Sequence, residues 1–259
     1  MSTYLFDSNS EDREWRRLRM IEAAVDADSI ALLDRTGVAT GWTCLELGAG
    51  AGSLVEWLGR RVGPQGLVWA VDKRPQYIRR FSSPPYRVAE GDFLAQQFER
   101  PLDLLHGRYV LIHNQCAADM LARIHSLMKP GGYVVLEEPD FTSADRLNHH
   151  ADAACQRVNE AICRMFLDAG LDPGFGLKLP GEAARAGLQV VDVKTTMHLC
   201  QGRSPVATVM AESARVLRHE YRGTGIATDA DIDHYVELAE DERHWAVYYS
   251  TASVLARAR

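Results

Sequence analysis

The stretch CLELGAGAGSL, residues 44–54, joins an apolar run to three glycines that alternate with alanine. Residues 42–48, WTCLELG, are typical of a buried strand, and apolar residues recur at helical spacing from Leu54 to Val62. Another apolar run, LVWAVD, follows at 67–72. Strand, glycine loop, helix and strand together span about thirty residues, which is the length of a βαβ crossover. We therefore predict a parallel sheet with a ligand-binding loop after its first strand.

The alternation of strands and helices continues along the chain. Further strands are predicted at 86–93, 102–110, 133–139, 188–199 and 245–256, and further helices at 117–128, 152–167, 206–222 and 229–240. Two helical stretches precede the first strand, and the glycine- and proline-rich residues 170–184 indicate a loop. The expected fold class is α/β, with a doubly wound, mostly parallel seven-stranded sheet and helical cap insertions.

A single domain is expected for all 259 residues. Its parts are N-terminal helices at 1–36, a cofactor-binding core at 37–139, cap helices at 140–180 and 203–241, and a last strand at 242–259. Helices inserted late in such a chain are candidates for a lid over the carboxyl ends of the strands, where ligands bind.

Composition and charge narrow the class of partner. The chain is 46% hydrophobic and 25% charged, as in ordinary soluble proteins. Its net charge of -6 offers no basic field for a polyanion. We therefore expect a small-molecule substrate, with neither nucleic acid nor membrane as a partner, and an oligomeric state that the sequence does not fix.

Cysteine usage and the N-terminal residues bear on location. The five cysteines are scattered and form no C-x-x-C pair, which argues against a disulfide framework and against a zinc site. The first residues, MSTYLFDSNSEDREW, soon turn acidic and have no apolar core. A cytoplasmic protein without a bound metal is expected.

The spacing of the glycine loop distinguishes between ligands. A P-loop requires Lys and then Ser or Thr after its last glycine, but Ser53 and Leu54 stand there. A dinucleotide loop requires a third Gly or Ala where Ser53 lies. The spacing present is E-x-G-x-G-x-G, and Glu46 would repel a pyrophosphate by about 4 kcal/mol at 4 Å and an effective dielectric of about 20. The same charge suits an ammonium or sulfonium ligand; alternatively, Glu46 only ties down the turn.

These features resemble the class I S-adenosylmethionine-dependent methyltransferases over nearly the whole chain, which implies their Rossmann-like fold and S-adenosylmethionine as cofactor. LELGAGAG is similar to the first motif of that family, and Asp72 stands where its members bind both ribose hydroxyls. GDF stands where they contact adenine, and MKPGGYVVLEE matches the turn before their fifth strand. The residues implied to bind the cofactor are Glu46, Gly48, Ala49, Gly50, Gly52, Asp72, Lys73, Gly91, Asp92, Phe93, Gly107 and Arg108. Alternatively, Asp72 is a turn residue and Asp92 a strand-end cap.

A narrower likeness to bacterial small-molecule methyltransferases lies at the start of the chain. YLFDSNSEDREWRRL is similar to a first segment that folds over the cofactor in those enzymes, with Tyr4, Glu14, Arg17 and Leu18 in comparable places. The likeness implies that Tyr4 and Arg17 lie at the cofactor, where a tyrosine ring beside a cation would contribute about 0.5–2 kcal/mol. Alternatively, Tyr4 belongs to a frayed terminus.

Methyl transfer from a sulfonium is an in-line displacement, to which positioning contributes roughly 7–11 kcal/mol. An acceptor that must lose a proton would gain about 10²–10⁴-fold from a base. His113, just past the fourth strand, is the candidate base; alternatively, it is a core histidine. Residues 82–86, SSPPY, are read as a turn, because the related motif of base-modifying methyltransferases carries Asn or Asp and closes the fourth strand.

The function expected is methylation of a small molecule, and a cap rich in methionine and aromatic residues favours an aromatic or natural-product-like acceptor. These cap residues are Met165, Phe166, Met197, Met210, Tyr221 and Tyr235, which would otherwise be plain core. Two rival interpretations remain. One is an NAD(P)-dependent oxidoreductase, and the other is a non-catalytic member of the fold that binds the cofactor or a protein partner.

Overall fold

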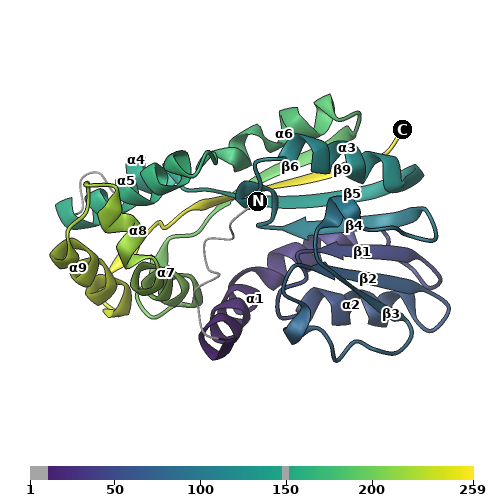
Figure 1. Ribbon diagram of the computed structural model, residues 1–259, viewed down its shortest axis with the longest axis horizontal. Coiled ribbons are helices and arrows are strands. Elements are labelled where there is room, and N and C mark those ends of the chain that lie inside the picture. Colours follow the sequence, from purple (N-terminus) through teal and green to yellow (C-terminus); the bar gives the residue numbers. More distant parts are fainter. Residues whose placement is uncertain (1–10, 148–151) are drawn as a thin grey trace.

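A seven-stranded sheet forms the centre of the protein in a computed structural model that describes residues 11–147 and 152–259. Along the sheet the strand order is β3-β2-β1-β4-β5-β9-β6 (Figure 1). Neighbouring strands from β3 to β5 run parallel, whereas β9 is antiparallel to both β5 and β6. The mostly parallel doubly wound sheet is therefore confirmed, including its antiparallel last strand. The strands are β1 Thr43–Leu47, β2 Leu67–Asp72, β3 Tyr86–Glu90, β4 Leu102–Arg108, β5 Met128–Asp140, β6 Gln189–Met197 and β9 Ser250–Arg257.

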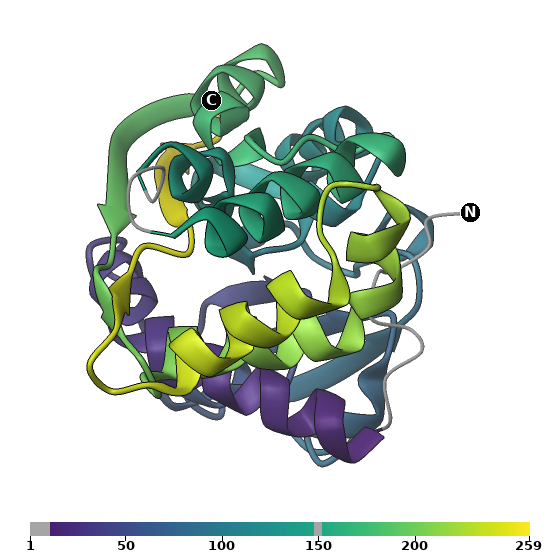
Figure 2. The same ribbon diagram turned by 90° about the vertical axis from the view of Figure 1, so that its left-hand side faces the viewer.

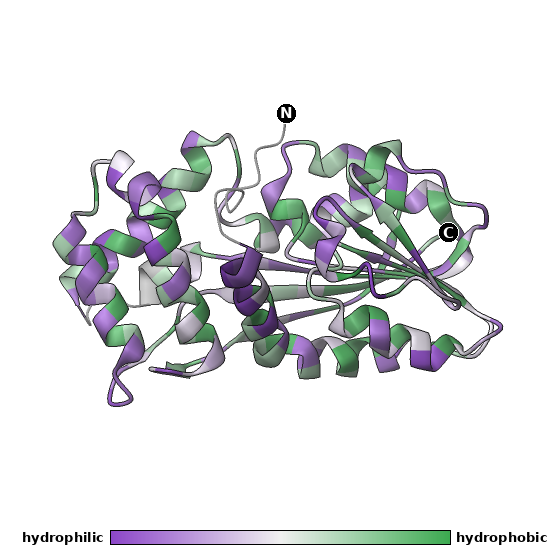
Figure 3. Cartoon of the chain, turned by 60° about the horizontal axis from the view of Figure 1, so that its bottom comes forward, coloured by the Kyte–Doolittle hydropathy of each residue, from purple (hydrophilic) through white to green (hydrophobic). Residues whose placement is uncertain are grey.

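Helices cover both faces of this sheet. On one face, α2 (Ser53–Val62) and the end of α1 (Glu11–Asp34) bury their apolar side chains against alternate strand residues such as Cys44 and Leu104. On the other face, α3 (Ala117–Leu127) and α6 (Phe175–Arg185) pack against the intervening residues, such as Leu45 and Leu105. The strands are apolar on both sides, as Figure 3 shows by their mostly green colour, because parallel sheets are buried on both faces.

The cap has a core of its own beyond the carboxyl ends of the strands. It is built from α5 (Ala153–Asp168), α7 (Pro205–Val216), α8 (Arg218–Gly223) and α9 (Asp229–Glu240), together with the short α4 (Thr142–Leu147). Figure 2 views the molecule from this side, with the cap helices in front of the sheet. The strands β7 (Cys200–Gln201) and β8 (Trp245–Ala246) pair with each other, and Cys200 and Ala246 pack into the core of the cap.

Four local predictions were wrong. The N-terminal residues form one continuous helix, α1, instead of two, because Ser29 is buried and its hydroxyl bonds to the carbonyl of Val25. Residues 170–184 were expected to be a loop, but α6 begins at Phe175 because Leu179 and Ala183 bury an apolar face against the sheet. The final segment splits into β8 and β9, and β5 begins earlier than predicted.

Candidate functional site

A cavity of about 420 Å³ opens at the carboxyl ends of the parallel strands, under the cap. One end is lined by the glycine loop and by the residues that follow β2, β3 and β4. The other end is lined by α5, α7, Phe141 and Tyr249, while α1 closes a third side. The strand ends supply polar groups and the cap supplies apolar ones, so the cavity has two chemically different halves.

The glycine loop is held in a backbone conformation that favours glycine. Gly48, Gly50 and Gly52 have φ values of +69°, +56° and +93°. A Cβ added to Gly48 would lie only 2.3 Å from Cγ2 of Val110, so the loop lies close against the segment after β4. The amide of Gly50 donates to the carboxylate of Asp72 over 2.9 Å. The loop is therefore shaped by its neighbours to present backbone groups to the cavity.

Two of the predicted acidic residues lie where the neighbouring strands β2 and β3 end. Asp72 accepts hydrogen bonds from the amides of Gly50 and Arg74, and burial raises its pKa. Each carboxylate oxygen retains acceptor capacity, so Asp72 can tie down the loop and still accept hydroxyl groups. Asp92 is exposed and caps the short helix 93–95 through the amide of Leu94. The turn and cap roles weighed from the sequence thus exist, and both residues also line the cavity.

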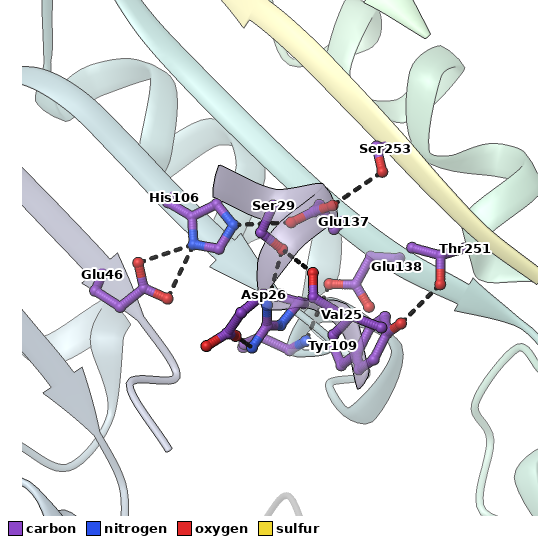
Figure 4. A network of polar contacts seen from close by, with 12 residues as sticks. Val25, Asp26, Ser29, Glu46, His106, Tyr109, Glu137, Glu138, Thr251 and Ser253 are labelled. Carbon is purple, nitrogen blue, oxygen red and sulfur yellow. Dashed lines mark hydrogen bonds and ion pairs between the residues drawn. The ribbon is translucent and has the colours of Figure 1, made fainter. Parts of the chain in front are cut away.

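A buried polar row lies across four strands, on the sheet face that α1 covers (Figure 4). Nδ1 of His106 is 2.8 Å from Oε2 of Glu46, and its Nε2 is 3.1 Å from Oε2 of Glu137. Ser253 donates to the other oxygen of Glu137 over 3.0 Å. We call Glu46, His106 and Glu137 the buried array. Of these three residues, only Glu46 lines the cavity.

The charges of the buried array shift one another's pKa. Burial would lower the pKa of His106, but the two flanking carboxylates raise it to about 9. Burial would raise the pKa of Glu137, but the hydrogen bond and charge of His106 lower it to about 2. Burial raises the pKa of Glu46, with His106 acting in the opposite direction. A proton is therefore retained on this array at neutral pH.

Helix α1 carries ion pairs along the third side of the cavity. Arg108 donates to Ser29 and to Asp26, each over 2.8 Å, which fixes the end of β4 against α1. Arg17 pairs with Glu14 over 2.7 Å, and both side chains are buried. Because Arg17 and Arg108 both line the cavity, the structure brings these two predicted residues to the same place.

The candidate base lies on a loop that a buried carboxylate anchors. Glu138 accepts hydrogen bonds from the amides of Val110, Leu111 and Ile112, over 3.0, 2.8 and 3.1 Å, and burial raises its pKa to about 7. His113 follows directly and lines the cavity. Burial, helped by the charge of Arg17, lowers the pKa of His113 to about 4, so its imidazole is neutral at pH 7.

The cap half of the cavity has an aromatic wall of four rings in sequence. Tyr249 lies 5.6 Å from Phe141 between ring centroids, Phe141 lies 5.3 Å from Phe166, and Phe166 lies 5.9 Å from His113. The same half of the cavity is also lined by Val209, Met210 and Ser213 of α7 and by Leu217, which follows that helix. Flat rings together with aliphatic side chains favour an apolar ligand.

Most of the predicted site residues line this cavity. They are Arg17, Glu46, Gly48, Ala49, Gly50, Asp72, Lys73, Gly91, Asp92, Phe93, Arg108 and His113. Gly52 and Gly107 are not among the lining residues: Gly52 is the N-cap of α2, and Gly107 packs between Leu47 and Leu136. Tyr4 lies outside the described residues.

The sequence reasoning missed His106, Glu137 and Glu138 as members of the site. Each is an ionisable residue within an otherwise apolar strand, in LLHGR and VVLEEP, and near the carboxyl end of that strand. That combination could have identified them, since a charged residue is rarely buried without a partner. Within residues 11–147 and 152–259, no group of three possible ligands could hold a metal ion, and no helix could cross a membrane.

Comparison with known proteins agrees with this geometry. A family model described as a methyltransferase domain matches residues 9–173. An uncharacterised 37.1 kDa protein in transposon TN4556 of Streptomyces fradiae is 29% identical over 228 residues, which cover 84% of this chain and only 64% of that protein.

Solved structures share the fold at low sequence identity. The mycolic acid cyclopropane synthase CmaA1, complexed with SAH and CTAB, has a TM-score of 0.60 at 14% identity and covers 91% of this chain and 85% of its own. A geranyl diphosphate methyltransferase in complex with SAM has a TM-score of 0.57 at 14% identity, and the match covers 99% of this chain and 94% of that one. The chain belongs to the methyltransferase domain family, and so to the S-adenosylmethionine-dependent methyltransferases that its motifs resemble.

Proposed function

We propose that this protein methylates a small, largely apolar acceptor that binds under the cap, with S-adenosylmethionine as the methyl donor. The observation that carries the proposal is the division of one cavity into a polar half at the glycine loop and an aromatic half at the cap. A methyl donor and an acceptor of different chemistry need two such adjoining halves.

The residues of the polar half fit an adenosyl ligand without phosphates. Asp72 is an acceptor suited to hydroxyl groups, and Ser53 and Leu54 follow the last glycine of the loop, where a phosphate-binding P-loop has Lys and then Ser or Thr. Gly48 and Gly50 would hold the cofactor at their backbone, and Glu46 would face its cationic part. When bound, the cofactor supplies an electrophilic methyl group on a sulfonium.

Positioning is the main contribution that we assign to the protein. The aromatic wall and α7 would hold an acceptor in place, and such orientation accounts for roughly 7–11 kcal/mol of a barrier. The neutral imidazole of His113 is available to take a proton from a hydroxyl or amine of the acceptor. We assign His113 this role because it stands where the aromatic wall meets the strand ends.

The test combines binding with turnover. Calorimetry should show that S-adenosylhomocysteine binds and that NADH does not. Turnover of S-adenosylmethionine with a panel of planar phenols, anilines and polyketide-like aromatics, followed by mass spectrometry, should give S-adenosylhomocysteine and a product heavier by one methylene. Tight binding of NADH, with no binding of S-adenosylhomocysteine, would point to the oxidoreductase instead. Methylation of small polar amines alone, with no aromatic acceptor, would refute the apolar acceptor.

A further inference from the structure

The proton count of the buried array can be read from its geometry. Both ring nitrogens of His106 face carboxylate oxygens, at 2.8 Å from Glu46 and 3.1 Å from Glu137. An ionised carboxylate only accepts hydrogen bonds, so each contact requires a proton between the two atoms. A neutral imidazole carries one such proton, and one more must therefore be shared. Two carboxylates with one additional proton have a net charge of −1, whichever atom holds that proton.

The groups packed against the array do not cancel this charge. From α1, Asp26 is paired with Arg108 of β4, and Glu22 is paired with Arg19. Ser29 of α1 and Ser253 of β9 are neutral hydrogen-bonding partners. Asp26 and Glu22 thus come with their own counter-charges, while Glu138, the next residue in β5, is held by three backbone amides and adds no positive charge. One negative charge is left in the wall, and Glu46 carries it to the cavity surface.

We propose that His106 and Glu137 are positioning and specificity residues, which with Glu46 form a buried −1 array that makes the site prefer a sulfonium ligand over its neutral thioether product. This inference rests on the proposed function, since it concerns the same cofactor site. His106 holds the Glu46 carboxylate in place, and Glu137 supplies the charge that remains after that pairing. A charge this well buried is weakly screened, so its effect persists in salt.

Glu137→Gln tests the charge without altering the cavity surface, because Glu137 does not line the cavity. Its amide oxygen can accept a hydrogen bond from a protonated His106, which makes the array neutral, whereas its amide N–H can donate to a neutral His106, which leaves the charge at −1. The nitrogen chemical shifts of His106, measured by NMR in the variant, distinguish the two. Calorimetry would give Kd for S-adenosylmethionine and for S-adenosylhomocysteine in each variant. For charges about 10 Å apart at an effective dielectric of about 20–40, removing one changes an equilibrium constant by about 4- to 15-fold. We expect the preference for the sulfonium ligand to fall by that factor.

Asp103→Asn is the matched control. Asp103 lies at the opposite end of β4, where it accepts from the amide of Thr43 over 2.8 Å and from Lys129 over 2.6 Å. This variant removes the same unit charge at a residue that does not line the cavity and that lies about 10 Å before His106 along β4, away from the carboxyl ends of the strands. The ratio of the two dissociation constants should stay at the wild-type value.

The outcomes separate the two proposals. If His106 stays protonated in Glu137→Gln and the ratio is nevertheless unchanged, or if Asp103→Asn shifts the ratio equally, the charged array is refuted while cofactor binding stands. If the wild-type protein binds neither ligand, the proposed function fails instead. Should Glu137→Gln not fold, Glu46→Gln replaces it with the same measurement of His106. Should His106 become neutral in the single variant, the double variant Glu46→Gln with Glu137→Gln removes both carboxylates and leaves the array without charge. The variant used must shift the ratio in the same direction for the inference to survive.

Discussion

Replacing Gly48 by alanine should damage the cofactor loop for two separable reasons. The φ of Gly48 is +69°, a conformation that costs an L-residue about 1–2 kcal/mol. The new Cβ would also lie 2.3 Å from Cγ2 of Val110, and such overpacking typically costs about 1–3 kcal/mol. We expect Gly48→Ala to lower the free energy of unfolding by about 2–5 kcal/mol and to weaken S-adenosylhomocysteine binding by at least about tenfold, the loss of one or two loop hydrogen bonds.

Two further variants separate these causes. Gly37 has a φ of +72° with no atom within 4 Å of its added Cβ, so Gly37→Ala measures the backbone cost alone. In Gly48→Ala with Val110→Ala, the close Cγ2 is gone and the nearest Val110 atom is the Cβ at 3.6 Å. This double variant should recover the packing part of the loss and most of the cofactor affinity.

Denaturant unfolding and calorimetry on five proteins decide the matter: the wild type, Gly48→Ala, Gly37→Ala, Val110→Ala and the double variant. The coupling between positions 48 and 110 should be about 1–3 kcal/mol and favourable. If Val110→Ala gives no rescue, or if Gly37→Ala is as harmful as Gly48→Ala, then the close approach of the loop to Val110 does not constrain the site, and the reasoning is refuted.

Three other changes test the anchor, the array and the wall. Glu138→Ala leaves three amides without their acceptor, so urea unfolding should show a loss of about 3 kcal/mol or more in the free energy of unfolding. The same change should lower kcat, because the segment that carries His113 loses its anchor. The pKa of His106 in the folded state, about 9, exceeds its ordinary value of 6.5. Its contribution to the free energy of unfolding, about 3 kcal/mol, is therefore complete below pH 6.5 and disappears as the pH rises to 9. Urea unfolding across that window should show the decline, and a flat profile would contradict it. Phe166→Leu should raise the acceptor KM and leave cofactor Kd unchanged, while Leu167→Ala, at a neighbouring side chain that is 58% exposed, should change neither.

The fold was predictable where local pattern and tertiary demand agree. The glycine loop and the apolar strands around it define the sheet, and their burial makes alternatives costly. Prediction failed at α6, because Gly176 and Pro180 are typical of loops. A Cβ on Gly176 would lie 2.6 Å from the carbonyl oxygen of Glu138, so this glycine lets the helix approach β5 closely. That reason is invisible until the two segments are placed side by side.

The polar half of the site was more predictable than the buried array behind it. Asp72 follows a strand at a recognisable spacing from the glycines, so sequence order alone indicates its place. Glu46, His106 and Glu137 come together only through strand register: Glu46 is opposite His106, and Glu137 is opposite Ser253. Register depends on the pairing of whole strands, which the local sequence does not specify. The charge of Glu46 was therefore recognised without the partners that determine it.

The cap shows how composition can indicate a pocket without identifying its lining. Of the six residues singled out there, four line the cavity: Met165, Phe166, Met210 and Tyr221. Met197 is instead 51% exposed on the edge strand β6, and Tyr235 is buried in the cap core away from the cavity. A helix gives each side chain a direction that repeats every 3.6 residues, but whether that direction meets core or cavity depends on how α5, α7 and α9 pack together. If the proposed function holds, variants at the four lining positions should change which acceptor the protein methylates, whereas variants of Met197 and Tyr235 should not.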